Sequence, residues 1–198
     1  QTPLAPCYED PCPDREWQEG QGIDLAFPQF PGCYFSVRWR FKGCPAPNEA
    51  QHYEITSFEL LQETPPGSRR ALYIWLRANP LNINQLYEFA IEKMASAIFE
   101  RQRLDGIINF GYCPDGSVNY TTRRVACNTF CYYEDTQNAK MIIIPKRCLG
   151  TFCCKVTTKF CIDEATQQTV TTKTIEPLGI PGECTSSVEL GECATFIS

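Results

Sequence analysis

Thirteen cysteines in a chain of 198 residues constrain this protein more than any other feature of its sequence. Disulfides, metal ligation and redox chemistry compete for them, and each use requires a different spacing. Zinc sites need Cys-x2-Cys pairs or histidines, whereas this chain has one histidine and spacings such as Cys7-x4-Cys12 and Cys127-x3-Cys131. It also lacks the haem motif Cys-x-x-Cys-His and the redox motif Cys-x-x-Cys. We therefore expect disulfides, with no metal and no cofactor.

Every cysteine is a candidate for a disulfide, and the odd total leaves one without a partner in its own chain. That cysteine is either a buried thiol or a covalent link between subunits. Position and strand parity place five cysteines outside the core, as candidates for contacts between subunits: Cys7, Cys12, Cys153, Cys161 and Cys193. The other disulfide candidates are Cys33, Cys44, Cys113, Cys127, Cys131, Cys148, Cys154 and Cys184, of which Cys33 and Cys154 are predicted to form core bridges.

The cysteine content is typical of an oxidising compartment, so we expect a protein that is secreted, extracellular or at the cell surface. The chain opens at Gln1 without an initiator methionine, which we interpret as a signal peptide already removed. The longest aliphatic run, residues 141–144, is stopped by Pro145, far short of the roughly 20 residues of a membrane span. A formal charge of -5 without any basic run favours no nucleic-acid partner.

The sequence predicts an N-terminal arm over residues 1–32 and a single disulfide-stabilised domain over residues 33–198. Six prolines and the absence of strand or helix periodicity make residues 1–32 an extended arm. The arm either wraps its own domain or reaches a neighbouring subunit. A short, partly apolar tail, residues 194–198, is suited to completing a sheet, either its own or a neighbour's.

Alternating apolar and polar residues predict a strand over residues 33–42, followed by strands over residues 52–61 and 70–77. The threonine-rich stretch near residue 165 predicts a hairpin of residues 154–162 and 169–175. Even positions of its first strand are mostly apolar, so Cys154 is expected to face the core. Cys153 and Cys161 are expected on the outer face.

Between these strand regions the period changes to that of a helix over residues 84–103, with Asn82 or Asn84 as the N-cap. Its wide apolar face is typical of a helix lying on one side of a sheet. The predicted fold class is therefore α+β, a mostly antiparallel, disulfide-rich sheet with one amphipathic helix packed on one face.

Two further segments have two interpretations each. Asn119-Tyr120-Thr121 is the single Asn-x-Ser/Thr sequon and follows a predicted turn, so Asn119 is a candidate for N-glycosylation or a chance match. Residues 140–145 combine strong strand preference with a lysine and a proline at their borders, which indicates a buried core strand or an edge used for assembly.

Catalytic motifs are absent from the sequence. The one histidine, His52, lies in a predicted strand and is expected on its surface, and no Gly-x-Ser-x-Gly or phosphate-binding glycine motif occurs. Carboxylate pairs suited to glycoside cleavage are available, as in any chain of this size. We therefore expect no enzyme.

These features favour a structural subunit of an extracellular assembly, such as a filament, sheath or surface appendage. Such a homo-oligomer or polymer would form by exchange of arm or tail strands, with disulfides between subunits as a further link. The alternative is a monomeric secreted binding module, for instance an adhesin, a carbohydrate binder or an inhibitor, and a secreted hydrolase is the third hypothesis.

Overall fold

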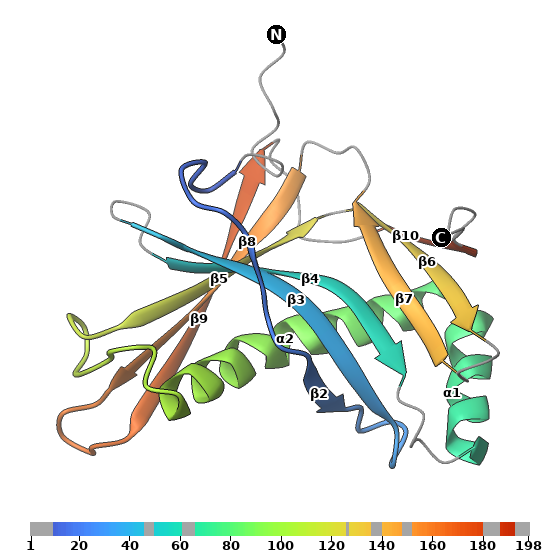
Figure 1. Cartoon of the computed structure of the whole chain (residues 1–198), viewed down its shortest axis with the longest axis horizontal. Helices are drawn as coiled ribbons and strands as arrows, with labels where there is room; N and C mark the ends of the chain where they lie inside the picture. Colours follow the sequence, from blue (N-terminus) through green and yellow to red (C-terminus); the bar gives the residue numbers. More distant parts are fainter. Residues whose placement is uncertain are drawn as a thin grey trace, which may run out of the picture.

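The computed structural model describes residues 10–45, 50–60, 66–125, 127–135, 140–147, 152–179 and 187–192. Within them a mixed sheet curls around a long helix (Figure 1). The strands before the helices are β1 (Gln18–Glu19), β2 (Ile23–Ala26), β3 (Tyr34–Cys44) and β4 (Ala50–Leu60). The helices are α1 (Pro66–Ala78) and α2 (Pro80–Leu104), and the later strands are β5 (Val118–Val125), β6 (Cys127–Asp135), β7 (Lys140–Arg147), β8 (Phe152–Ile162), β9 (Thr169–Gly179) and β10 (Ser187–Glu192).

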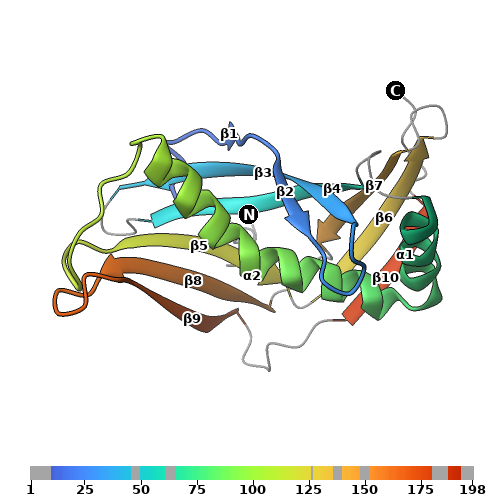
Figure 2. The ribbon, with the colours of Figure 1, turned by 90° about the horizontal axis from the view of Figure 1, so that it is seen from below.

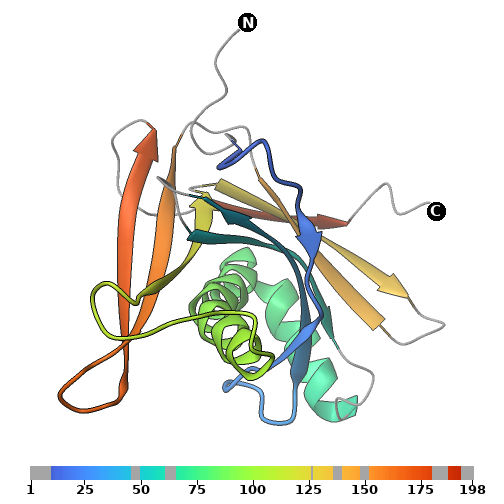
Figure 3. The same cartoon turned by 60° about the vertical axis from the view of Figure 1, so that its left-hand side comes forward.

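Strand β4 is the branch point of the sheet. Its whole length pairs with β3 along one edge, while its other edge pairs first with β5 and then with β7. Between those two stretches the register with β3 shifts, so that Thr56 is an extra residue, and a bulge of this kind bends and twists a strand. β4 thereby joins two groups of strands, β5-β8-β9 and β7-β6-β10, which diverge in Figure 3.

The α+β class is confirmed, but the sheet is mixed. β4 pairs in parallel with β5, and β10 in parallel with β6, whereas the other ladders are antiparallel. Residues 140–145 belong to β7, which lies between β6 and β4 and is therefore an interior strand. Met141 and Ile143 on this strand are buried, so this segment has the core role of its two predicted roles.

A helix over residues 84–103 is confirmed, although α2 begins earlier, at Pro80. The N-cap is Asn79, whose side chain accepts a hydrogen bond from the Leu81 N–H at 3.0 Å, and not Asn82 or Asn84. Pro80 follows at the first helical position, where its missing N–H costs no intrahelical bond. The buried residues recur at helical spacing and are Ile83, Leu86, Tyr87, Ala90, Ile91, Met94, Ala95, Ile98 and Phe99.

The strand predicted over residues 70–77 is wrong, because these residues form most of α1. Leu72 and Leu76, four positions apart, are fully buried, whereas Ile74 is 61% exposed. A strand would place these three side chains on one face, and a helix separates Ile74 from the other two. The continuous apolar run of residues 71–76 fits either period, so packing against the core selects the helix.

Helix α2 lies along the concave face of the sheet (Figure 2) and contacts three of its strands through two hydrogen bonds and one aromatic stack. The hydroxyl of Tyr53 on β4 donates to the carbonyl oxygen of Ile91 at 3.4 Å. The hydroxyl of Tyr120 on β5 donates to Oε1 of Gln102 at 2.6 Å, and burial raises the pKa of this phenol, which keeps its proton on the donor. The ring of Phe99 stacks on that of Phe160 on β8, with centroids 4.2 Å apart.

Residues 18–30 pack on their own domain. β1 and β2 pair with the free edge of β3, and between them the carbonyl of Gln21 accepts from the Trp39 indole at 2.8 Å. A Cβ at position 20 would lie 2.2 Å from the Trp39 ring, so only glycine lets the backbone cross there. Of the two predicted roles of the arm, this part takes the intramolecular one.

The bond between Tyr120 and Gln102 gives a first prediction. Tyr120→Phe leaves the buried Gln102 carbonyl without its donor, so the free energy of unfolding should fall by about 1–2 kcal/mol in guanidinium titrations. Tyr34→Phe, at an exposed position, is the control and should change it by less than about 0.5 kcal/mol. Equal effects of the two substitutions would contradict this account of how α2 is held.

Candidate functional site

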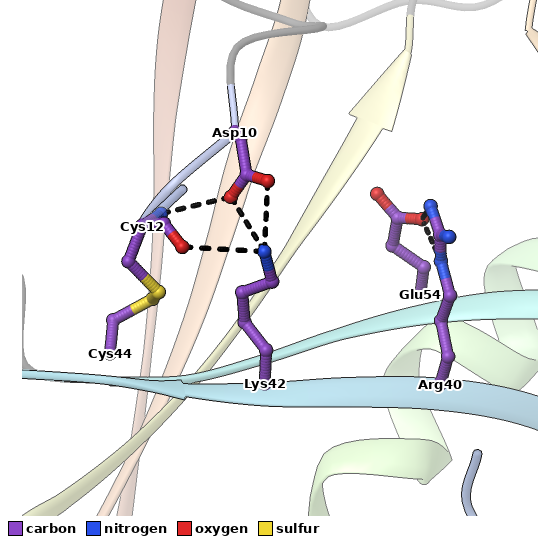
Figure 4. A network of polar contacts seen from close by, with 6 residues as sticks. All are labelled: Asp10, Cys12, Arg40, Lys42, Cys44 and Glu54. Atoms are coloured by element: carbon purple, nitrogen blue, oxygen red, sulfur yellow. Dashed lines mark hydrogen bonds and ion pairs between the residues drawn. A yellow bond between two sulfur atoms is a disulfide. The ribbon is translucent and has the colours of Figure 1, made fainter. Parts of the chain in front are cut away.

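Residues 10–17 are fastened to the outer face of the sheet, opposite α2, by three kinds of contact, of which Figure 4 shows the ion pair and the disulfide. The side chain of Lys42 is 1% exposed, and its ammonium donates to both carboxylate oxygens of Asp10 at 2.8 Å. Cys12 forms a disulfide with Cys44 at the end of β3. The Trp17 ring centroid lies 4.9 Å from the Lys42 ammonium. We call Asp10, Cys12, Trp17, Lys42 and Cys44 the N-terminal clamp.

The electrostatics of the clamp depend on Asp10. Burial alone would raise the pKa of its carboxyl, but the pKa is lowered below the ordinary value of 3.8. The Lys42 ammonium and the Cys12 N–H both donate to this carboxylate, and Arg123 adds a further positive charge nearby. The ionised form of Asp10 therefore makes the ion pair with Lys42 that attaches residues 10–17 to the sheet.

The clamp continues into a row of polar side chains across four strands. Strand register aligns Lys42 of β3 with His52 of β4, Thr121 of β5 and Thr157 of β8. Thr121 and Thr157 share a hydrogen bond between their hydroxyls at 3.2 Å. The surface position expected for His52 is wrong, since it is 8% exposed and lies in this covered row. Local sequence pattern predicts neither the register that aligns these four strands nor the packing of residues 10–17 over Lys42.

A polar cavity of about 560 Å³ opens beside the clamp, at the end of β3 and the start of β5. Side chains of Arg15, Gln51, Asn109, Ser117 and Asn119 line it. Asn119 is partly buried within β5, opposite Lys159 of β8, and its Oδ1 is enclosed without a hydrogen-bond partner among the described atoms. The candidate glycosylation site therefore faces a cavity and does not project from a turn.

Strand β9 forms one end of the sheet. It pairs with β8 over eleven residues without a register shift, and no strand of the described chain pairs with its other edge. Every residue from 169 to 177 is exposed, including the apolar Val170 and Ile175. β9 is thus a long edge strand that is uncovered on both faces as well as along one side.

The hydrogen bonds of Ile162 show which groups of β9 face that free edge. Its N–H donates to Gly111 at 2.8 Å and its carbonyl accepts from the Cys113 N–H at 2.9 Å, so both groups point away from β9. Ile162 and Thr169 are consequently a non-hydrogen-bonded pair, and such pairs alternate with bonded ones along an antiparallel ladder. Thr171, Lys173 and Ile175 therefore direct their N–H and C=O groups outward.

Several of the predicted disulfide candidates are bonded. Cys12 joins Cys44, Cys113 joins Cys161, and Cys153 and Cys154 are also disulfide-bonded. Cys153 and Cys161, predicted on the outer face, are both buried, although alternation along β8 still directs them away from the face of Phe160 in the core cluster. A disulfide partner covers each sulfur, and for Cys161 the partner lies in the loop before β5. Bonding within the chain also removes Cys12 and Cys161 from the candidates for a covalent link between subunits.

Cys33 is a free thiol that is 1% exposed, so the core bridge predicted for it is wrong. Burial raises the pKa of this thiol. Cys33 is the free cysteine among the described side chains, and the other twelve cysteines of the sequence are an even number that is able to pair completely within one chain. Six other candidates lie outside the described residues or have side chains outside them: Cys7, Cys127, Cys131, Cys148, Cys184 and Cys193.

Neither a metal centre nor a membrane helix is found in the part of the chain that the structure describes. No three histidine, cysteine or acidic side chains gather there, and neither helix is long and apolar enough to cross a bilayer. A scan against protein-family models and searches of curated proteins and of solved structures found no match.

The burial of Cys33 predicts slow labelling of its thiol. In the native protein a thiol reagent should react with Cys33 at least 100-fold more slowly than after unfolding in guanidinium, because the thiol is enclosed and its thiolate disfavoured. Peptide mass spectrometry without reductant identifies the labelled residue, and Cys33→Ser is the control. Rapid native labelling at Cys33 would contradict the burial.

The N-terminal clamp predicts a stability that depends on pH. Asp10→Asn should lower the free energy of unfolding by about 1–2 kcal/mol at pH 7, a value below that of a fully buried pair because Asp10 is 39% exposed. The pKa of Asp10 is lowered in the folded state, so its contribution is present above pH 4 and is lost as the pH falls through that lowered pKa. Denaturant titrations from pH 7 to pH 2 should show the two proteins converge.

Glu100→Gln is the matched control for Asp10→Asn. It removes an ion pair with Arg103 whose side chains are both about half exposed, so it should cost less than about 0.5 kcal/mol. An Asp10→Asn effect as small as this one would show that the clamp does not depend on Asp10.

Proposed function

We propose that this protein is a structural subunit of an extracellular assembly that grows by adding a strand of a neighbouring copy to the free edge of β9. The observation that carries the proposal is the edge itself. Residues 169–177 are all exposed, and Thr171, Lys173 and Ile175 direct outward main-chain groups that pair with no strand of the described chain. Exposed edges of this length are templates for pairing with another chain.

Natural sheets usually protect such edges with short strands, bulges, prolines, inward charges or a covering loop. β9 has eleven residues and no bulge. Pro177 lies in line with the outward-facing positions and removes one donor near the end of the strand, a usual place for an edge proline. The stretch before it, residues 169–175, keeps Lys173 as its single charge and all its main-chain donors.

Covalent bonds brace the elements around this edge. Cys113–Cys161 ties the loop before β5 to β8, the strand that carries β9, and farther from this edge Cys12–Cys44 ties the N-terminal segment to β3. A disulfide typically contributes about 2–4 kcal/mol. Intramolecular disulfides fit an oxidising, extracellular setting, and bracing next to an edge suits a subunit through which load passes.

A second candidate function, ligand binding by a monomer, is favoured by the polar cavity beside the clamp. Its volume lies in the range of small-molecule sites, and polar residues line it, among them Arg15, Gln51 and Asn119. The two functions differ in the role of β9, since a monomeric binding module does not use its free edge.

Blocking the edge tests the proposal. Lys173→Pro removes an outward N–H that the ladder with β8 does not use, so the fold should persist while strand addition fails. We expect the wild type to form polymers, seen by negative stain and light scattering, and the variant to show at least a ten-fold smaller polymer fraction. Lys173→Ala, which keeps the N–H, should assemble like the wild type.

Melting curves of the three proteins show whether Lys173→Pro is folded. A wild type that stays monomeric at all concentrations, or a folded Lys173→Pro that assembles normally, would refute this mode of assembly and favour the binding module.

A further inference from the structure

We infer that the occupant of the free β9 edge is residues 193–198 of a second copy of this chain, an inference that rests on the proposed function.

The two ends of the sheet lie far apart in the molecule. β9 is one end of the strand order and β10 is the other, and Figure 1 shows them toward opposite ends of the longest axis. Residues 193–198 follow β10 directly. Pairing the β10 end of one copy with the β9 end of the next is a heterologous contact, and repeated contacts of this kind form open filaments.

The sequence of residues 193–198 is suited to a donated strand. Thr195 and Ile197 are β-branched and Phe196 is aromatic, which are the residue types enriched in strands. No proline or charge interrupts residues 194–198, so each residue offers both a donor and an acceptor. This segment is therefore able to form an unbroken ladder along either of its edges.

Residues 1–9 are the competing donor within the chain and are less suited to it. Pro3 and Pro6 lie three positions apart, so one falls on each edge of an extended segment. Whichever edge faced β9 would lack a donor, and prolines hold the backbone near polyproline geometry. The N-terminal clamp beginning at Asp10 also fastens the base of this segment over β3, away from β9 in the strand order.

The donor segment, residues 193–198, matches the acceptor stretch of β9 in length and in its apolar side chains. The acceptor stretch, residues 169–175, spans about 23 Å at roughly 3.3 Å per residue, and six donor residues span about 20 Å. β9 exposes one large apolar side chain on each face, Val170 on one and Ile175 on the other. Phe196 and Ile197 are consecutive and so also project to opposite faces, and a register that places Phe196 opposite Val170, or Ile197 opposite Ile175, forms one apolar cross-strand pair.

The test compares three variants of the full chain: deletion of residues 194–198, deletion of residues 1–6, and Lys173→Pro. The deletion of 194–198 retains Cys193 and should raise the critical concentration for assembly at least ten-fold, with an unchanged melting temperature. The deletion of 1–6 should assemble as the wild type does. A fluorescent peptide with the sequence of residues 194–198 should bind the first variant, and Lys173→Pro introduced into that variant should abolish the binding.

Failure of this inference is distinguishable from failure of the proposed function. If Lys173→Pro blocks assembly while the deletion of 194–198 assembles normally, the edge is used but this segment is not the donor. Loss of assembly on deletion of residues 1–6 alone would identify the N-terminal segment instead. A closed dimer that survives both deletions would show that two β9 edges pair with each other, and a wild type that never assembles would overturn both proposals.

Discussion

The packing of α2 into the curved sheet is the interaction on which the rest of the structure depends. Hydroxyls of Tyr53 and Tyr120 and the ring of Phe160 attach the helix to β4, β5 and β8 in turn. A flat sheet would meet a single helix along a narrow line, so the sheet must bend to bury the wide apolar face of α2. The bulge at Thr56 provides that bend, because it lies between the part of β4 that pairs with β5 and the part that pairs with β7.

This curvature has two consequences for function. Helix α2 contacts β4, β5, β8 and β10, whereas β9 extends beyond it and is exposed on both faces. The convex face is left for the N-terminal clamp, which buries Lys42 beneath Asp10 and Trp17 and closes that part of the surface. The described part of the molecule therefore has one sheet surface covered by the N-terminal clamp and one exposed strand edge, that of β9. We propose that assembly uses the β9 edge.

Local pattern predicted the elements whose period is clear, namely β3, β4, the hairpin of β8 and β9, and α2. It failed for α1, where a continuous apolar run fits both periods and contacts of Leu72 and Leu76 with the core select the helix. Strand parity predicted the face of Cys153 and Cys161 but not their burial, because a disulfide partner covers a side chain on either face. The burial of Lys42 was equally hidden, since its cover comes from a segment about thirty residues earlier.

The amino-acid sequence alone established the disulfide chemistry and the mixture of strands with a long amphipathic helix, because both follow from composition and short-range spacing. Which cysteine stays free, which strand ends the sheet, and which main-chain groups face outward are properties of the folded chain. They depend on pairings between residues far apart in sequence, such as Cys113 with Cys161 and Ile162 with Gly111, and on the direction of each hydrogen bond. No local pattern encodes these, since the same alternating strand has the same pattern at an edge and in the interior.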